Sequence, residues 1–163
     1  MGDRMFCTGT FQRSMDGKQR ILLPKPVRQF LLGADGLFLT PGTEGCLELH
    51  NEASLQQLAA DFQQSQATYQ SKSTFSRIFF AQSQRCQMDA HDRLRVPAGL
   101  SEFAGLASPI VLVGVGSHWE IWGGSRWEEY LVSHQANFDH HARLVRGGTS
   151  GQETELQLPR HAK

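Results

Sequence analysis

The sequence predicts a mainly β fold with flanking helices, in which two internal repeats of one chain form a pseudo-two-fold β-barrel. The first observation behind this prediction is that MDGKQRILLPKPVRQF, at residues 15–30, aligns without a gap on MDAHDRLRVPAGLSEF, at residues 88–103. The second is that the alignment continues from LFLT onto IVLV and, after a one-residue slip, from LELH onto WEIW. Two copies are too few for a solenoid, so we expect them to complete one another.

The distribution of charge is the third observation. The formal net charge is zero, but residues 1–30 contain six Lys or Arg and two acidic residues, whereas residues 31–70 contain five acidic residues and no Lys or Arg. The same order recurs, with five basic and two acidic residues in 71–100 and one basic and five acidic residues in 101–140. A two-fold axis between the repeats would place Arg20 near Arg93 and merge the two basic blocks into one patch.

Each repeat shows the same order of local signals. RILLP at 20–24 and RLRVP at 93–97 are typical of short strands. Pro24-Lys25-Pro26 favours a short helix over 26–32, because proline suits the first helical turn, and Gly33 is placed to end it. A turn at Asp35-Gly36, a strand LFLT, a turn PGTEG and a strand CLELH are expected to follow.

A longer helix is predicted to close each repeat, because apolar residues recur there at helical spacing. These stripes are Leu55, Leu58, Ala59 and Phe62 in the first repeat and Trp127, Tyr130, Leu131, His134 and Phe138 in the second. Between them, Phe75, Ile78 and Phe79 predict a short helix before a strand QRCQM. Because neither repeat can bury its apolar face alone, we expect 5–70 and 71–141 to share one barrel, and 142–163 to form a flexible tail.

The composition limits the class of protein. A chain of 163 residues with 39% hydrophobic and 20% charged residues is ordinary for a soluble globular protein. No apolar run approaches the roughly 20 residues that span a bilayer, and MGDRMFCTGTF lacks the apolar core of a signal peptide. Cys7, Cys46 and Cys86 are an odd number without C-x-x-C spacing, so we expect small buried side chains in a reduced, cytoplasmic protein.

These motifs resemble those of a known family. An Asp-x-x-x-Arg loop, then a strand ending in Pro and a short helix, is similar to the swapped-hairpin domains of AbrB-like transcription factors. Two copies in tandem, each followed by helices, resemble the MraZ family of bacterial transcriptional regulators. Met5-Phe6, FFAQSQRCQMD at 79–89 and HWEIW at 118–122 add to the resemblance, which covers about residues 5–140.

The resemblance implies a repressor of the cell-division and cell-wall gene cluster, located in the cytoplasm at the nucleoid. It implies a ring-shaped homo-oligomer, an octamer, that binds short direct repeats in double-stranded promoter DNA. It implies no membrane partner, no small-molecule substrate and no cofactor. The matched loop residues are Arg20 and Arg93, which would face the DNA, with Asp16 and Asp89 as the matched carboxylates.

The chemistry of these side chains allows two roles that are compatible. Arg20 and Arg93 can bind phosphates or guanine edges, and each can also pair with the Asp four positions earlier and fix its loop. Asp16 and Asp89 are expected to structure the loops, because phosphates repel a carboxylate whereas turn amides bind it. The wider predicted DNA-binding footprint comprises Arg13, Lys18, Lys25, Arg28, His91 and Arg95, the last facing either solvent or DNA.

The chain departs from the family motif at one position of each loop. The usual motif has glycine before the arginine, whereas this chain has Gln19 and Asp92. Glycine would permit a positive φ angle there. We expect Gly17 to take over by shifting the first turn, and Asp92 to tolerate the left-handed region. Asp92 also adds a negative charge beside the proposed DNA surface.

Other functional classes remain as alternatives. A non-enzymatic interaction or assembly protein on the same fold, with weakened or lost DNA binding, is favoured by the zero net charge and the two altered loops. An enzyme is not expected, because no Ser or Cys nucleophile has an obvious base and no glycine loop cradles phosphate. The remaining candidates are interpreted structurally. His134, Asp139, His140 and His141 could form a metal cluster, but we expect a solvated helix end, and Trp119, Trp122 and Trp127 are expected at core or subunit-interface positions.

Overall fold

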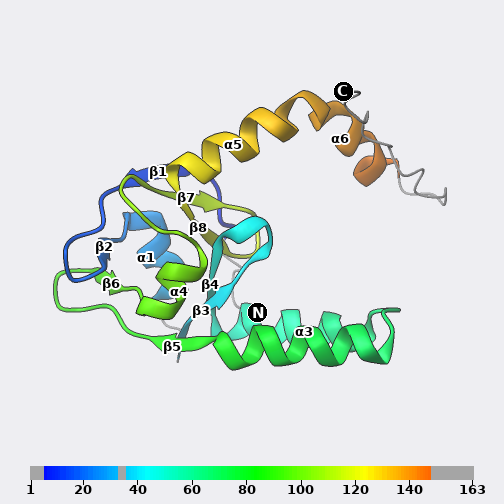
Figure 1. Cartoon of the computed structure of the whole chain (residues 1–163), viewed down its shortest axis with the longest axis horizontal. Coiled ribbons are helices and arrows are strands. Elements are labelled where there is room, and N and C mark those ends of the chain that lie inside the picture. Colours follow the sequence, from blue (N-terminus) through cyan, green and yellow to red (C-terminus); the bar gives the residue numbers. More distant parts are fainter. Residues whose placement is uncertain (1–5, 33–35, 148–163) are drawn as a thin grey trace, which may run out of the picture. The chain divides into compact units, whose positions relative to one another are not determined.

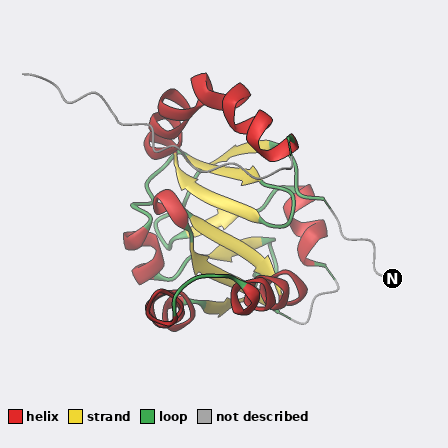
Figure 2. Ribbon diagram, turned by 90° about the vertical axis from the view of Figure 1, so that its right-hand side faces the viewer, coloured by secondary structure: helices red, strands yellow, loops and turns green. Residues whose placement is uncertain are grey.

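A computed structural model describes residues 6–32 and 36–147 of the chain. The chain divides into a larger unit, 1–129, and a smaller one, 130–163. All strands lie in the larger unit, next to one another and flanked by helices (Figures 1 and 2). Among the described residues, no helix combines the length and apolar composition needed to cross a bilayer.

Each repeat supplies four strands. They are β1 Thr10–Arg13, β2 Arg20–Leu22, β3 Leu37–Pro41 and β4 Leu47–Asn51, then β5 Gln84–Cys86, β6 Arg93–Arg95, β7 Ile110–Gly114 and β8 Trp119–Gly123. Six of them form one antiparallel sheet in the order β1-β7-β8-β4-β3-β5, and β2 pairs with β6 in a separate ribbon. This order reads the same when the repeats are exchanged and the sheet is turned round, so the structure has the predicted pseudo-two-fold symmetry.

The strand pairing shows that each repeat adds its first strand to the other repeat. Strand β1 of the first repeat pairs with β7 of the second, and β5 of the second pairs with β3 of the first, in equivalent registers. On the axis, Glu48 pairs with its counterpart Glu120, and Ile21 pairs with its counterpart Leu94. Isolated bridges at Met15–Ile21 and Met88–Leu94 join the β2–β6 ribbon to both edges of the sheet and close the barrel.

The core of the barrel is formed equally by both repeats. Strand alternation turns one side chain in two inward, and the fully buried positions include Ile21, Leu39 and Leu49 with their counterparts Leu94, Leu112 and Ile121. Trp119 belongs to this core, whereas Trp122 is buried on the other face of its strand. Cys7 and Cys46 are buried as predicted, Cys86 is half-buried, and no disulfide joins them.

Two short helices seal the barrel at equivalent places. Helix α1, Lys25–Leu31, begins at the predicted proline pair and buries Val27, Phe30 and Leu31. Helix α4, Ala98–Phe103, is its counterpart and buries Leu100. Gly33 and Asp35, the predicted helix end and turn residue, lie outside the described residues.

The first repeat closes with a helical hairpin. Helix α2, Glu52–Gln64, is capped by Asn51, whose side chain accepts a 2.8 Å hydrogen bond from Ser54 N. Helix α3, Tyr69–Gln82, is longer than the short helix predicted here, and Thr68 caps it. Phe62 stacks on Phe75, with ring centroids 5.0 Å apart, so the predicted stripe of α2 contacts α3 at this residue. The expected turn PGTEG contains the 3₁₀ helix η1, Thr43–Gly45.

The predictions for the end of the chain need correction. The single closing helix predicted through Phe138 is interrupted, because α5, Gly124–His134, ends in the 3₁₀ helix η2, Gln135–Asn137. Helix α6, Phe138–Arg146, then continues beyond Ala142, where the flexible tail was predicted to begin. Its apolar residues Leu144 and Val145 lie between Arg143 and Arg146 at the end of the helix. The rest of the predicted tail, from 148, lies outside the described residues.

Candidate nucleic-acid interface

The first Asp-x-x-x-Arg loop joins β1 to β2 and is organised by Asp16. Its Oδ1 accepts hydrogen bonds from Lys18 N and Arg20 N, both at 2.9 Å, and its Oδ2 accepts one from Arg20 Nε at 2.8 Å. The Arg20 Nη2 atom lies 2.7 Å from the same oxygen. Asp16 therefore accepts hydrogen bonds from two amides of the turn and holds the Arg20 side chain as well.

The second loop, between β5 and β6, repeats this arrangement. Asp89 Oδ1 accepts from His91 N at 2.8 Å and from Arg93 N at 3.0 Å, and its Oδ2 accepts from Arg93 Nε at 2.8 Å. Hydrogen bonds to the charged form lower a carboxyl pKa. Those from Arg20 and Lys18 hold the pKa of Asp16 below its usual value. Burial acts in the opposite direction on Asp89, yet the bonds from Arg93 and His91 still leave its pKa lowered.

The residue before each arginine adopts the left-handed conformation. Gln19 has a φ of 58° and Asp92 a φ of 60°. The expectation that Gly17 would supply the positive φ is therefore wrong, because Gln19 adopts it directly. The turn itself requires this conformation: Gln19 N donates to Asp16 O at 2.9 Å and Asp16 N donates to Arg20 O at 3.0 Å, the pattern of a type I turn followed by one left-handed residue. Across the pseudo-two-fold axis, the carbonyl oxygen of Asp92 accepts from Leu23 N at 3.1 Å, and that of Gln19 accepts from Val96 N at 2.9 Å. Each loop is thus hydrogen-bonded to the residue that follows the ribbon strand of the other repeat.

The two loops lie side by side, as the symmetry argument predicted. Strands β2 and β6 pair Arg20 with Arg95 and Leu22 with Arg93. Arg20 Nη1 also lies 3.9 Å from Asp89 Oδ2 in the other loop. The side chains of Arg20 and Arg93 are 25% and 30% exposed, so both are partly accessible. The structure therefore brings together the two arginines that the sequence singled out.

Arg28, which was predicted to extend the DNA-binding footprint, reaches the second loop. It extends from α1 and forms an ion pair with Asp92 of the second loop. The extra negative charge expected at Asp92 is therefore balanced by a cation from the other repeat. Arg28 has no symmetric counterpart for this contact, because the equivalent position in α4 is Ser101.

The other predicted footprint residues divide into two groups. Lys18, Lys25, His91 and Arg95 are exposed. Arg13, at the end of β1, is half-buried and donates from Nη1 to Gln12 O at 2.8 Å. The structure does not join Arg13 to the loop arginines by any contact among the described residues.

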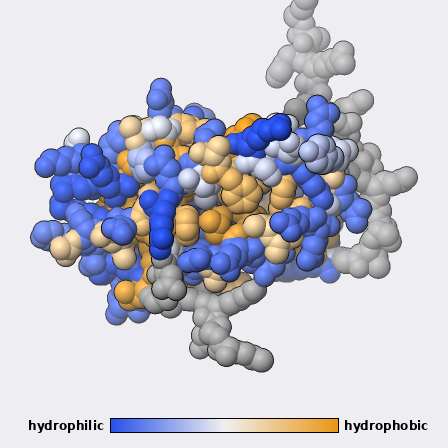
Figure 3. All heavy atoms as spheres, turned by 90° about the horizontal axis from the view of Figure 1, so that it is seen from below, coloured by the Kyte–Doolittle hydropathy of each residue, from blue (hydrophilic) through white to orange (hydrophobic). Residues whose placement is uncertain are grey.

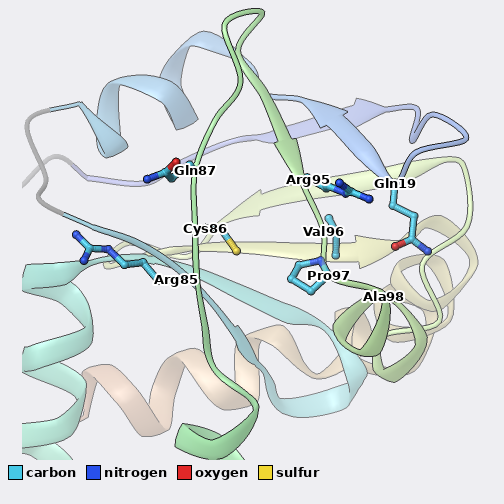
Figure 4. A pocket seen from close by; sticks show the side chains of 8 residues that line it. All are labelled: Gln19, Arg85, Cys86, Gln87, Arg95, Val96, Pro97 and Ala98. Carbon is cyan, nitrogen blue, oxygen red and sulfur yellow. The ribbon is translucent and has the colours of Figure 1, made fainter.

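A pocket of about 390 Å³ lies beside the paired loops (Figure 4). Arg95 and Gln19 border it from the β2–β6 side, and Arg85 and Cys86 border it from β5. Its remaining lining residues are Gln87, Val96, Pro97 and Ala98. The sequence reasoning did not single out Arg85, although its place in QRCQM, four residues before Asp89, could have indicated it.

Apolar side chains are exposed away from the loops. On α3 they are Tyr69, Phe75, Ile78 and Phe80, of which Tyr69 is 87% exposed. Figure 3 views the molecule from the side on which α3 lies and shows apolar side chains among polar ones. Within the smaller unit, Val132, Phe138, Leu144 and Val145 are exposed as well. Such surfaces are suited to contacts between proteins.

The metal-ligand side chains that gather in the described part of the chain are not those considered in the sequence. They are Glu48, His50 and His118, whose candidate ligand atoms all lie within 4.8 Å of one another. His134 instead contacts Tyr130, and His140 contacts His141 edge-on. The signal available in the sequence was Glu-x-His in one strand and His-x-Glu at the start of another.

Comparison with known proteins gives a consistent result. The family model described as "MraZ protein, putative antitoxin-like" matches the chain twice, over residues 5–78 and 79–146. A protein of Leifsonia xyli named "Transcriptional regulator MraZ" is 35% identical over 130 residues, which are 80% of this chain and 90% of the relative. Proteins of the same name from Lactiplantibacillus plantarum and Mycoplasmoides gallisepticum are 32% and 30% identical, over 80% and 84% of this chain and 92% and 93% of their own length.

Proposed function

The chain belongs to the MraZ family of transcriptional regulators, and on that premise we propose that it binds double-stranded promoter DNA through its paired Asp-x-x-x-Arg loops. The observation that carries the proposal is the placement of Arg20 and Arg93 on the same outward face of the β2–β6 ribbon, where both lie next to Asp89. Two partly exposed arginines of a protein with zero net charge thereby share one surface.

The local charge supports a phosphate-binding surface. Residues 15–30 and 88–97 together contain six Lys or Arg and three Asp, although the whole chain is neutral. Lys18 and Arg95 are exposed beside the loop arginines. Lys and Arg side chains that replace counterions on DNA give affinity that falls steeply with salt. We expect that dependence here.

The loop carboxylates are compatible with this role. A guanidinium group has five N–H donors, and the bonds to Asp16 or Asp89 use only part of them. Because the aspartates fix the direction of each arginine in advance, less side-chain entropy is lost on binding. The aspartates therefore hold both arginines in a fixed orientation before DNA binds.

The regulatory details of the proposal follow the family resemblance. We propose a homo-oligomeric ring, an octamer, that binds short direct repeats and represses the cell-division and cell-wall gene cluster by blocking the promoter, in the cytoplasm at the nucleoid. The exposed apolar side chains of α3 and α6 support contacts between subunits. In a ring, each loop pair can bind weakly, because neighbouring pairs supply a high effective concentration.

A non-enzymatic assembly protein on the same fold is the second candidate. It is favoured by the three aspartates at the proposed surface, which form ion pairs with Arg20, Arg93 and Arg28. In that case the same bonds would serve only to hold the two repeats together, and DNA affinity would be weak at every salt concentration.

The deciding experiment compares Arg20→Ala/Arg93→Ala with wild type in fluorescence anisotropy titrations on DNA from the protein's own upstream promoter. Arg77→Ala/Arg146→Ala removes two exposed charges from helices instead and is the matched control. We expect the loop variant to lose at least about 100-fold in affinity at moderate salt and the control to lose little. Light scattering after size-exclusion chromatography establishes that the oligomer is intact. Unchanged affinity of an intact loop variant would rule out the loops as the DNA-binding surface.

A further inference from the structure

Two acidic residues face each other at the centre of the six-stranded sheet. Strands β4 and β8 are neighbours, and their register places Glu48 directly opposite Glu120. The alternate residues of both strands, Leu47, Leu49 and Ile121, point into the core, so the two glutamates lie on the opposite face. Like charges in this cross-strand position destabilise a sheet. Their side chains are only 15% and 17% exposed, which increases the need for a compensating cation.

Two histidines approach these carboxylates, one from each repeat. His50 Nε2 lies 2.9 Å from Glu48 Oε2. His118 Nε2 lies 3.9 Å from Glu48 Oε1 and equally 3.9 Å from Glu120 Oε1. This His118 nitrogen is buried and makes no hydrogen bond. It is a ligand atom directed at two carboxylate oxygens without a hydrogen-bonding partner.

The side chains of this cluster are oriented by a second layer of polar contacts. Ser54 Oγ lies 3.0 Å from His50 Nδ1, and Ser117 Oγ lies 3.0 Å from His118 Nδ1. Trp122 Nε1 donates a 2.8 Å hydrogen bond to Glu120 Oε2. Such partners fix the tautomer and direction of metal-binding residues. In both histidines they leave Nε2 as the nitrogen that faces the carboxylates.

The two imidazole rings lie close together beside these carboxylates. Those of His50 and His118 are stacked with centroids 4.7 Å apart. The candidate ligand atoms of Glu48, His50 and His118 lie within 4.8 Å of one another, so one ion can reach all three.

We propose that Glu48, His50 and His118 bind a divalent transition-metal ion of the Zn²⁺ class, with Glu120 as the fourth ligand. Imidazole nitrogens and carboxylate oxygens are preferred ligands of Zn²⁺. A tetrahedral site with bonds of about 2.0–2.1 Å keeps its ligand atoms about 3.3 Å apart, and the separations of 2.9 and 3.9 Å already lie on either side of that value. The charge of the ion would match that of the two glutamates.

The proposed ion would link the two repeats at the axis. Glu48 and His50 come from β4, His118 immediately precedes β8, and Glu120 lies within β8. Because these ligands are distinct from the loop residues, metal binding should stabilise the fold whether or not the loops bind DNA. The test therefore needs the protein alone, and its result is independent of the proposed function.

The experiment uses the full chain, treated with a chelator, dialysed and titrated with Zn²⁺ by isothermal calorimetry. His118→Asn removes the unpartnered ligand, and His140→Asn/His141→Asn removes two exposed histidines of α6 as the matched control. We expect one ion per chain in wild type and control, with a rise in Tm, and a loss of at least about tenfold in affinity in His118→Asn. Circular dichroism of the metal-free proteins checks their folding.

A second variant covers a folding failure of the first. Glu48→Gln keeps the shape of the side chain and removes a ligand charge, so it should also lose affinity and should change the visible spectrum of bound Co²⁺. The proposal is overturned if wild type binds no Zn²⁺ at micromolar concentrations. It is equally overturned if the folded His118→Asn or Glu48→Gln protein binds as tightly as wild type, or if the α6 control abolishes binding.

Discussion

The two Asp-x-x-x-Arg loops have nearly the same backbone and different charge environments. The Asp16 N to Arg20 O hydrogen bond is 3.0 Å long, and the equivalent bond from Asp89 N to Arg93 O is 2.9 Å. Both loops place their fourth residue in the left-handed region. The first loop, however, exposes Lys18 and has the neutral Gln19, whereas the second exposes His91 and has Asp92, which is paired with Arg28.

This difference shows which properties of the repeat the fold requires. The backbone hydrogen bonds cross the pseudo-two-fold axis in both directions, so a change in either loop would loosen the strand of the other repeat. The side chains that face outward have no such constraint and can diverge. We infer that the first loop supplies most of the DNA affinity and that the second loop mainly completes the barrel.

The largest expected effect separates the two arginines. Arg20→Ala should lower affinity for promoter DNA about 10- to 100-fold, the usual loss for an arginine that contacts bases or several phosphates. Arg93→Ala should cost several-fold less, because the Arg28–Asp92 ion pair adds no net charge beside its loop, whereas the first loop adds the exposed Lys18. Anisotropy titrations of both single variants at one salt concentration make the comparison. Equal losses, or a larger loss for Arg93→Ala, would contradict the proposed division of roles.

The conformational part of the comparison can be tested by stability. Gln19→Gly should raise the free energy of unfolding by about 0.5–1 kcal/mol, because relief of a left-handed side chain exceeds the added entropy of the unfolded chain. Asp92→Gly should gain less, since Asp tolerates this region better than Gln and the variant loses the Arg28 ion pair. Urea unfolding followed by tryptophan fluorescence measures both. A loss of stability in Gln19→Gly would show that the glutamine side chain itself holds the loop.

A smaller effect is expected from the charge of Asp92. Asp92→Asn keeps a residue that accepts a positive φ, removes one negative charge from the proposed surface and releases Arg28 for phosphate contact. Affinity for DNA should rise about threefold and the salt slope should steepen by about one. Glu102→Gln, an exposed acid at α4, is the control for a change in net charge alone. An affinity of Asp92→Asn below wild type would mean that the Arg28–Asp92 pair orders the interface.

Much of the fold could be predicted from the sequence because the two repeats share their pattern of buried residues. The helix at Pro24-Lys25-Pro26, the strands LFLT and CLELH and the pairing of the loops follow from local chemistry and symmetry. Strand β1 was not predicted, since TFQR has no apolar run. The gap-free alignment of 15–30 on 88–103 nevertheless extends backwards and places FQRSM at 11–15 on the predicted strand QRCQM. The internal alignment was therefore more informative than hydrophobicity at this point.

The features that the sequence did not predict depend on contacts between distant residues. The ion pair of Arg28 with Asp92 joins positions 64 residues apart and exists in only one direction, so repeat symmetry could not indicate it. Likewise, Glu48 and His118 come together only through the pairing of β4 with β8. The hydrogen bond that the carbonyl of Gln19 accepts from Val96 across the axis likewise depends on the pairing of the two repeats, which local propensity does not encode.

The smallest expected effect concerns Gly17, at the tip of the first loop. If this glycine supplied the positive φ, as the sequence suggested, alanine there would be strained and the protein less stable. In the structure Gly17 lacks a positive φ, and an added Cβ would meet no atom within 4 Å. Gly17→Ala should therefore raise the free energy of unfolding by about 0.5 kcal/mol, through the lower entropy of the unfolded chain.

Gly45→Ala is the contrasting variant. Gly45 has a φ of 76° and lies against Arg126, so alanine at this position should destabilise the protein. Urea unfolding midpoints of the two variants are the measurement. A destabilised Gly17→Ala would show that residue 17, and not Gln19, has the backbone conformation that disfavours a side chain.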